Sequence, residues 1–354
     1  MFHVSENIPL VLTVFFFISF IFSVLINRIL LKFAQTLGAR GKNADEVRWN
    51  PQIKPSLGGI SFFVGFLLSY IFLNLLQTLD YAYRIKLTGI LISCTLAFLM
   101  GLADDAFNTQ PLLKFLAQIT CALILLFTGT YVKIFENDFL NMVVTIIWIV
   151  GIMNSLNMLD NMDGITTLVS ISICTFFIVI NISLKQTLHP FSILSIGLLA
   201  SLLGFLIYNF HPSKMFMGDT GSQFLGVFLG AGAIHFCWNI TAATTEFDYK
   251  LIHFVLVGLV FLLPIIDTGT VVINRIIKGN SPFIGGKDHT THYLYFRGIT
   301  EKRIAILYLI ISLAGISLAY NLILSFSYTL LWVCISFIAL VFIALYINTV
   351  THKP

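Results

Sequence analysis

Long apolar runs alternate with short polar breaks along the whole chain. A stretch of roughly 20 apolar residues crosses the hydrocarbon core of a bilayer as a helix, because each helical residue advances about 1.5 Å. The pattern predicts eleven such helices, at about 8–31, 57–78, 85–103, 112–132, 139–156, 164–183, 190–210, 220–238, 251–274, 303–324 and 328–349. We therefore expect an all-α polytopic membrane protein with a single domain over residues 1–354.

The composition supports this class and excludes an ordinary soluble domain. Hydrophobic residues make up 58% of the chain and charged residues 10%, with a mean hydropathy of +0.94, whereas soluble domains are about a quarter charged. The first apolar run begins near Ile8 without a basic segment or a small-residue cleavage motif, so we interpret it as a retained helix. All five cysteines fall inside expected spans and match no metal or redox spacing.

Basic residues lie mainly on one side if the spans alternate. Of the 20 lysines and arginines, 15 fall in the ends and loops that share a side and 5 on the other. The positive-inside rule makes the richer side cytoplasmic, with the N-terminus outside and the C-terminus inside. Its loops are about 32–56, 104–111, 157–163, 211–219 and 275–302. The chain's unusual polar clusters all fall on that face, although the assignment was made without them.

The first cluster is the acid pair Asp104-Asp105 at the end of the third span, followed by Lys114. Adjacent carboxylates can hold a hard cation through oxygen ligands, and their repulsion can leave one of them basic enough to take a proton. Lys114 lies within reach of the pair or of a phosphate. The alternatives are a solvated helix end and a lysine whose ammonium reaches the interface.

The second cluster spaces Asn154, Asn157, Asp160 and Asp163 by threes. Each step of three drifts about 60° around a helix, so the four cannot form one stripe. We expect the helix to end near Asp160, with Asp163-Gly164 capping the next one. The alternative is that both acids are only caps at a tight helix hairpin.

The third cluster, Gly218 to Ser222, precedes the eighth span. A helix start offers free backbone N–H groups and a positive dipole to an anion, while Asp219 can hold a cation that bridges to it. Phe216 could stack on a base. The alternative is a cap with a flexible turn.

The fourth cluster is the loop 275–302, which contains Arg275, Lys287, Asp288, His289 and His292. Phosphate binding fits these residue types better than zinc, because no further Cys or His lies nearby. A basic loop that touches anionic lipid is the alternative.

The four clusters together put acids and bases on one face, a combination that fits a substrate with a metal-bound pyrophosphate. Asp267 lies deeper in the ninth span, where burying a charged carboxylate costs free energy, so we expect it to be functional or paired.

These motifs resemble the polyprenyl-phosphate N-acetylhexosamine-1-phosphate transferases, over about residues 32–300. The matching features are the acid pair with its lysine and Gln118; the segment from Asn154 to Gly164; the N-x-x-P-x-x-x-F-M-G-D-x-G-S segment from Asn209 to Ser222; the basic, histidine-containing loop; and Pro55-Ser-Leu-Gly58-Gly59.

The resemblance implies transfer of a sugar-1-phosphate from a UDP-sugar, with UDP-GlcNAc as the expected donor, to undecaprenyl phosphate. UMP is released, and the reaction needs Mg²⁺, with Mn²⁺ as an alternative. It implies an enzyme of the bacterial cytoplasmic membrane that initiates a cell-envelope polysaccharide such as O-antigen, with no nucleic-acid partner. Homodimerisation, the sugar and a covalent intermediate stay open.

The resemblance also implies roles for single residues. Asp104, Asp105, Lys114 and Asp160 are expected to be catalytic, with Asp219 and Asp104 as metal ligands. The expected substrate-binding residues are Asn157, Asp163, Asn209, Phe216, Arg275, His289 and His292.

Two departures from the family pattern stand out. Asn161 replaces a glycine between the two acids, and D-H-x-x-H replaces three consecutive histidines, which makes the muramoyl-pentapeptide branch an unfavoured assignment. Lys54 is a candidate for a uridine or phosphate contact. The rival functions are a transporter that uses the acids as an ion or proton relay and a non-catalytic scaffold; a transporter predicts polar residues on both sides and inverted repeats, which we do not find.

Overall fold

The computed structural model describes residues 8–36, 54–184, 189–240, 250–281 and 286–351. The first loop of the expected cytoplasmic face falls mostly in 37–53, outside this range, as does 282–285 of the last loop. The described helices are α1 (Ile8–Thr36), α2 (Gly58–Leu76), α3 (Tyr81–Phe107), α4 (Pro111–Phe127), α5 (Asp138–Leu159), α6 (Ile165–Ser183), α7 (Pro190–Asn209), α8 (Gly218–Ala233), the π-helix η1 (Ile234–Trp238), α9 (Lys250–Val260), α10 (Leu262–Ile277), α11 (Thr290–Phe296), α12 (Glu301–Leu324) and α13 (Tyr328–Thr351).

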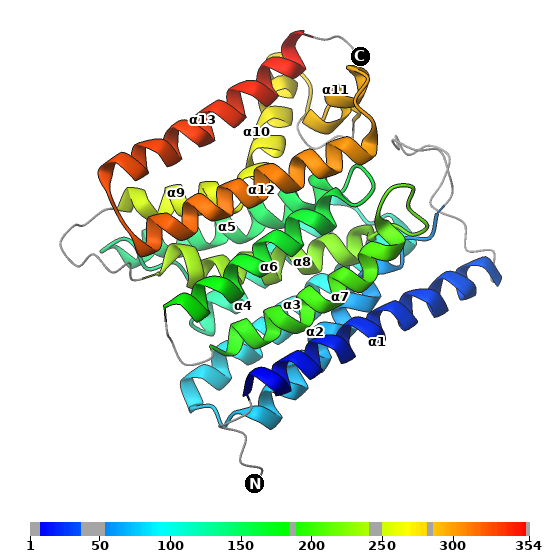
Figure 1. Ribbon diagram of the computed structural model, residues 1–354, viewed down its shortest axis with the longest axis vertical. Helices are drawn as coiled ribbons and strands as arrows, with labels where there is room; N and C mark the ends of the chain where they lie inside the picture. The colour runs from blue at the N-terminus through cyan, green and yellow to red at the C-terminus, as the bar shows by residue number, and fades with distance from the viewer. Residues whose placement is uncertain (1–7, 37–53, 185–188, 241–249, 282–285, 352–354) are drawn as a thin grey trace.

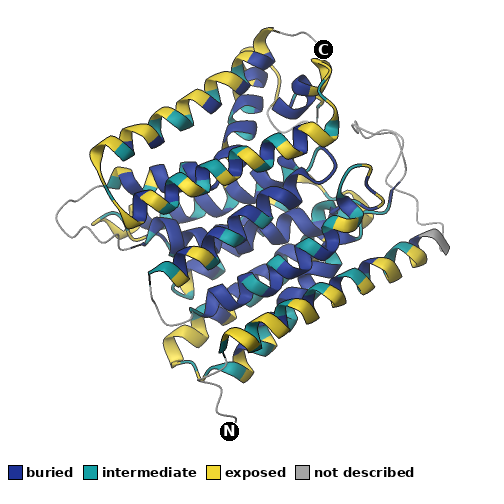
Figure 2. Cartoon of the chain, in the orientation of Figure 1, coloured by how far each residue is buried: buried dark blue, intermediate teal, exposed yellow. Residues whose placement is uncertain are grey.

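Helix α8 lies at the centre of the bundle and packs against α2, α3 and α5. Every residue from Thr220 to Ala233 is buried. Figure 2 shows the buried interior and the exposed faces of the outer helices α1 and α13. Small residues permit this central position: an added Cβ at Gly226 would lie 2.5 Å from the Cα of Met153 in α5.

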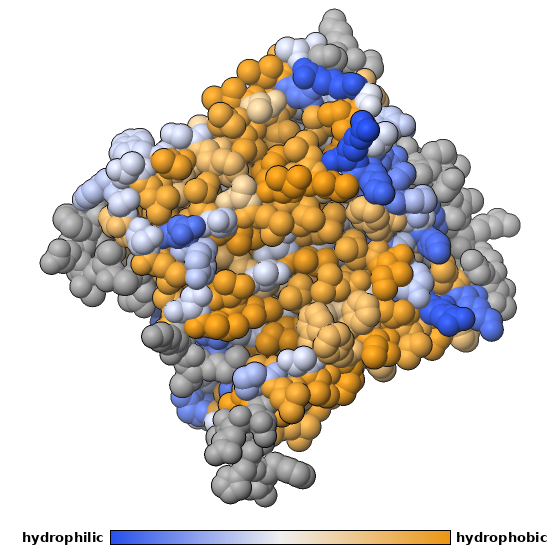
Figure 3. Space-filling view, in the orientation of Figure 1, coloured by the Kyte–Doolittle hydropathy of each residue, from blue (hydrophilic) through white to orange (hydrophobic). Residues whose placement is uncertain are grey.

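The all-α polytopic class is confirmed for the described residues. Eight helices are long and apolar enough to cross a membrane, or nine if the bent pair α9–α10 counts as one span. Figure 3 shows the apolar surface across the middle of the molecule, with hydrophilic residues gathered toward its ends. Each of the eleven apolar runs coincides with one helix or with two consecutive helices.

Three local features were not expected. The run 251–274 is broken by a bend of 87° between α9 and α10. Pro264 accounts for the break, because its ring conflicts with the carbonyl four residues earlier, at Val260, where α9 ends. The expected loop 275–302 contains α11, and α8 ends in the π-helix η1.

The polar clusters meet at one end of the bundle. Helices α3, α5 and α7 end there, and α4, α6 and α8 begin there, because consecutive helices run in opposite directions (Figure 1). The expected helix end near Asp160 is confirmed, since α5 ends at Leu159. Gly164 is the N-cap of α6, and its φ of +76° is a conformation that favours glycine.

Candidate active site

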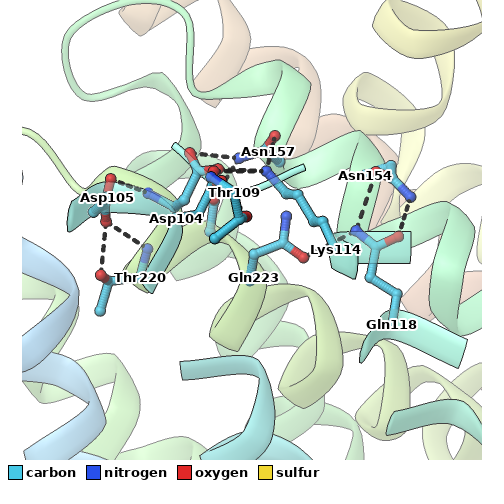
Figure 4. A network of polar contacts seen from close by, with 11 residues as sticks. Asp104, Asp105, Thr109, Lys114, Gln118, Asn154, Asn157, Thr220 and Gln223 are labelled. Atoms are coloured by element: carbon cyan, nitrogen blue, oxygen red, sulfur yellow. Dashed lines mark hydrogen bonds and ion pairs between the residues drawn. The ribbon is translucent and has the colours of Figure 1, made fainter. Parts of the chain in front are cut away.

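Lys114, near the start of α4, lies at the centre of a polar network drawn in Figure 4. Its ammonium donates to Asp219 Oδ2, to Asp104 Oδ2 at 3.3 Å and to Asn157 Oδ1 at 3.5 Å. These partners come from the C-terminal ends of α3 and α5 and from the N-terminal end of α8. Residues from three of the sequence motifs are therefore brought together around one cation.

Asn157 fixes the second oxygen of Asp219. Its Nδ2 donates to Asp219 Oδ1 at 3.1 Å and to Ser222 Oγ at 2.9 Å. The network continues beneath Lys114 through the side-chain amides of Gln118, Asn154 and Gln223, at distances from 2.8 to 3.1 Å. Buried amides that are joined to one another in this way hold their rotamers, so α4, α5 and α8 are locked together directly below the site. Sequence reasoning did not single out Ser222 or Gln223 as contributors.

The two members of the acid pair have different surroundings. Asp104 is buried and accepts hydrogen bonds from the Thr109 amide at 2.9 Å and hydroxyl at 2.6 Å, besides that from Lys114. Asp105 Oδ2 accepts hydrogen bonds from the Thr220 amide at 2.8 Å and hydroxyl at 2.7 Å. Its Oδ1 accepts a hydrogen bond from the Asp219 amide at 3.2 Å. Asp105 thus satisfies the free N–H groups at the start of α8, as a capping carboxylate does.

Asp160, the C-cap of α5, is half-buried, and no lysine or arginine of the described residues pairs with it. Burial, and next the negative charge of Asp219, raise the pKa of Asp160 to about 7. Asp104, Asp105 and Asp219 lie in the same network as Lys114. The site therefore carries more negative charge than Lys114 neutralises, which favours a further cation or a proton.

Asp163 is the centre of a second cluster. It accepts hydrogen bonds from the Ser213 amide at 2.9 Å and hydroxyl at 2.7 Å, and lies 3.2 Å from His211 Nδ1 and 3.6 Å from Lys54 Nζ. His211 also lies 3.1 Å from Glu301 Oε2 at the start of α12. Asp163 is only 4% exposed and ties the loop after α7 to the start of α6.

Phe216 is hydrogen-bonded through its backbone to the Pro55–Gly59 segment. The ammonium of Lys54 lies 5.1 Å from the centre of the Phe216 ring, a cation–π geometry. The Phe216 amide donates to the Pro55 carbonyl at 3.0 Å, and the Gly58 amide donates to the Phe216 carbonyl at 3.1 Å. Gly59 meets the backbone of α8, where an added Cβ would lie 2.4 Å from Gly221 N. The two glycine-containing motifs therefore interlock.

Asn209 lies outside these groups of functional side chains. It accepts a hydrogen bond from the Thr167 hydroxyl at 2.7 Å and donates to the Met215 carbonyl at 3.1 Å. Its side chain is 2% exposed and shapes the turn that carries Ser213 and Phe216. Its expected role in substrate binding stays a prediction.

The last cluster surrounds α11. The Arg275 guanidinium forms a bidentate pair with Asp288, with distances of 2.7 and 2.6 Å, and this pairing lowers the pKa of Asp288 against the effect of burial. Asp267 lies 2.8 Å from His289 Nδ1 and accepts a hydrogen bond from the Thr290 amide at 2.9 Å. Asp267 is therefore paired, as its cost inside a span requires.

His292 is buried beside His289, and its Nδ1 accepts a hydrogen bond from the His289 amide at 3.4 Å. Burial lowers the pKa of His292 to about 3, so this imidazole is neutral at physiological pH. A hydrogen bond joins α11 to the segment between α5 and α6: the Thr291 hydroxyl donates to Asn161 Oδ1 at 2.6 Å.

The residues present fit a hard divalent cation. The carboxylates of Asp104 and Asp219 already converge on one positive group, the Lys114 ammonium, and offer the oxygen ligands that Mg²⁺ prefers. A different group of three metal-capable side chains occurs among the described residues: the ligand atoms of Asp163, His211 and Glu301 lie within 4.8 Å of one another. His211 already contacts both acids, and Asp163 also accepts a hydrogen bond from Ser213.

Comparisons with known proteins bear on the same motifs. Residues 87–237 match the family model described as glycosyl transferase family 4. A protein of Bacillus subtilis (strain 168), described as a probable undecaprenyl-phosphate N-acetylglucosaminyl 1-phosphate transferase, is 29% identical over 84% of this chain and 82% of its own length. A decaprenyl-phosphate N-acetylglucosaminephosphotransferase of Mycolicibacterium smegmatis is 28% identical over 72% of this chain and 68% of its own.

A more distant relative is the phospho-N-acetylmuramoyl-pentapeptide-transferase of Carboxydothermus hydrogenoformans, which is 27% identical over 73% of this chain and 81% of its own length. The resemblance inferred from the motifs is thereby confirmed. The matched segment runs from the first half of α3 into η1 and so contains Asp104, Lys114, Asn157 and Asp219.

Proposed function

From its relationship to glycosyl transferase family 4, we propose that this membrane protein transfers N-acetylglucosamine-1-phosphate from UDP-GlcNAc to undecaprenyl phosphate. UMP is the second product, and the step initiates an envelope polysaccharide. The observation that carries the proposal is the Lys114 network, in which residues of three family motifs converge on one ammonium at one end of the bundle. The relatives named as N-acetylglucosamine-1-phosphate transferases support the sugar.

The chemistry is an in-line displacement. An oxygen of the lipid phosphate attacks the β-phosphorus of the UDP-sugar, the bond to the α-phosphate oxygen breaks, and UMP leaves. Lys114 is placed to neutralise a phosphate oxygen, and Asp219 and Asp104 to hold Mg²⁺. When bound, Mg²⁺ neutralises charge on the pyrophosphate and polarises its oxygens. Arg275 and His289 supply donors for the diphosphate or the sugar.

Asp160 is the best-suited proton acceptor of the cluster. The carboxylates of Asp104 and Asp105 already accept hydrogen bonds from Thr109 and Thr220. The pKa of Asp160, raised to about 7, is close to the second pKa of a phosphate monoester, roughly 6. We assign to Asp160 the proton of the lipid phosphate, and to Phe216 and Lys54 one wall of the uridine pocket.

The active-site end of the bundle is proposed to face the cytoplasm of a bacterium, with the N-terminus outside. The basic residues support this orientation, because 15 of the 20 belong to that side. Eight helices, or nine with the bent pair α9–α10, are long and apolar enough to cross a membrane. We propose that α4 and α8 with η1 cross as well, which gives eleven crossings and puts the N-terminus and C-terminus on opposite sides.

The test is direct. Purified protein in neutral detergent, given radiolabelled UDP-GlcNAc, undecaprenyl phosphate and Mg²⁺, should move label into the lipid phase, and a panel of UDP-sugars should rank UDP-GlcNAc first. The variant Asp219→Asn should lose roughly 10²-fold or more of kcat, because it removes a charge that acts on the reacting phosphates. Asp138→Asn, at the opposite end of α5, is the matched control. Absence of lipid label with every UDP-N-acetylhexosamine would refute the proposal.

A further inference from the structure

A cavity of about 270 Å³ lies at the end of the bundle opposite the active site. It is lined by the first turns of α3, the loop after α4, the start of α7 and the end of α8 with η1. Lys86 on its wall and Asp104 in the active site are 18 residues apart on α3, which corresponds to roughly 27 Å along the helix. The cavity is therefore separate from the proposed catalytic centre.

Positive charge without an acid marks the described lining of the cavity. Lys86 and Lys133 both line it, and none of its lining residues is an Asp or a Glu. Lys86 Nζ lies 5.3 Å from the Tyr83 ring centre, and Lys133 Nζ lies 4.7 Å from that of Tyr131. No carboxylate of the described residues pairs with either lysine. Two ammonium groups beside one cavity give it a positive potential, which favours an anion.

Two imidazoles make up part of the wall. The rings of His189 and His235 stack with centres 3.8 Å apart and an interplanar angle of 16°. His189 Nδ1 accepts a hydrogen bond from the Phe191 amide at 3.2 Å. In the neutral ring the proton therefore sits on Nε2, and this buried atom has no hydrogen-bond partner. Burial lowers the pKa of His189 to about 3, which agrees with a neutral ring. His189 is thus a neutral part of the wall, and the charges on the lining residues are those of Lys86 and Lys133.

The cavity wall is held in place. Asn239, just after η1, accepts a hydrogen bond from the Lys133 amide at 2.8 Å and donates to the Tyr131 carbonyl at 2.8 Å. The π-helix η1 supplies His235, and π-helical turns of this kind occur frequently at functional sites. The loop that carries Lys133 is therefore fixed against the end of α8.

Most of the remaining lining is apolar, including Leu87, Ile90, Pro190, Phe191 and Ile234. The volume is slightly below the roughly 300–1,000 Å³ of pockets that enclose drug-sized ligands. The ligand is thus a small anionic group attached to an apolar body that stays largely outside. We propose that this cavity binds the phosphate headgroup of a membrane lipid, at the face opposite the active site. The inference does not depend on the proposed transferase function.

The test compares lipid binding to the purified full chain in neutral detergent by native mass spectrometry. The probes are phosphatidylglycerol and, as the control without phosphate or charge, diacylglycerol. Wild type should bind phosphatidylglycerol about tenfold or more tightly than the double variant Lys86→Gln/Lys133→Gln, because two charge-assisted contacts to phosphate are lost. Diacylglycerol should not distinguish the two.

Lys250→Gln is the matched control, because Lys250 lies over Phe135 on the same side but does not line the cavity. Its binding should equal that of wild type. The single variants Lys86→Gln and Lys133→Gln should each weaken binding and serve if the double variant is unstable. Equal phosphatidylglycerol binding by wild type and the lysine variants that line the cavity would overturn the proposal. Dependence on the two lysines seen for inorganic phosphate, but not for lipid, would overturn the lipid as occupant.

Discussion

Asn161 shows how a single residue that departs from a family pattern can acquire a structural partner. Its Nδ2 donates to the Met158 carbonyl at 2.9 Å, which closes the end of α5, and its Oδ1 accepts the Thr291 hydroxyl at 2.6 Å. A glycine at this position has no side chain to reach α11. The contact connects the two-acid segment to the helix that carries His292.

We expect this contact to position α11 over the site without taking part in the reaction. Asn161→Ala and Thr291→Val should each lower kcat/KM about threefold to tenfold, since a hydrogen bond contributes about 0.5–1.5 kcal/mol. The double variant should be little worse than either single one, because both remove the same interaction. Effects that multiply in the double-mutant cycle would show that the two residues act separately.

At the scale of helices, the contact of α3 with α8 decides where the carboxylates lie. Gly101 meets the backbone of α8, and an added Cβ would lie 2.3 Å from the Asp219 carbonyl oxygen. One turn later, Asp105 accepts hydrogen bonds from the first amides of α8. The close approach and the cap together set the position of Asp219 relative to Asp104.

Gly101→Ala should therefore lower both stability and activity. Forcing α3 and α8 apart costs about 1–3 kcal/mol, and turnover should fall further because the carboxylates separate. Gly151→Ala is the matched control: nothing lies within 4 Å of its added Cβ in α5, so the alanine should be neutral or stabilising by up to about 1 kcal/mol. Thermal melts measure the stability of the two variants, and the transfer assay measures their activity. A Gly101→Ala protein as stable as wild type would contradict this account of the packing.

At the scale of the whole molecule, the concentration of carboxylates at one end of the bundle makes stability depend on pH. The pKa of Asp160, about 7 in the folded protein, exceeds the ordinary value of about 3.9. The folded state therefore binds more protons than the unfolded state between about pH 4 and pH 7. The contribution of Asp160 to stability is complete below this range and is lost as the pH rises through it.

Comparison with Asp160→Asn isolates this effect, because His189 and His292, whose pKa values are lowered by burial, act in the opposite direction in both proteins. Without metal, wild type should lose at most about 2 kcal/mol of stability relative to Asp160→Asn between pH 5 and pH 8. Mg²⁺ competes with protons for the carboxylates, so it should raise the melting temperature of wild type more at pH 8 than at pH 5, with sodium chloride of equal ionic strength as the control. Equal stabilisation by Mg²⁺ at both pH values would argue against metal binding at this cluster.

Much of the fold follows from the hydrophobic pattern, because a bilayer requires apolar helices of nearly constant length. Each apolar run coincides with a helix or a consecutive pair, and their alternation correctly placed the clusters at one end of the bundle. The bend at Pro264 and the short helix α11 were missed. A proline in a long apolar run does not reveal how far the helix turns, and seven residues of mixed polarity give too weak a period.

The sequence by itself determined the helical class, the end of the bundle where the chemistry gathers, and the set of acids, amides and bases present, because hydropathy and residue type depend only on the chain. Tertiary structure alone decided which of them meet. Lys114 pairs with Asp219 and Asp104, Asp105 caps α8, Asp163 holds Ser213, and Asn161 reaches Thr291. Such contacts join residues from 10 to 130 positions apart. They depend on how closely glycine-bearing helices approach, which no local pattern of residues encodes.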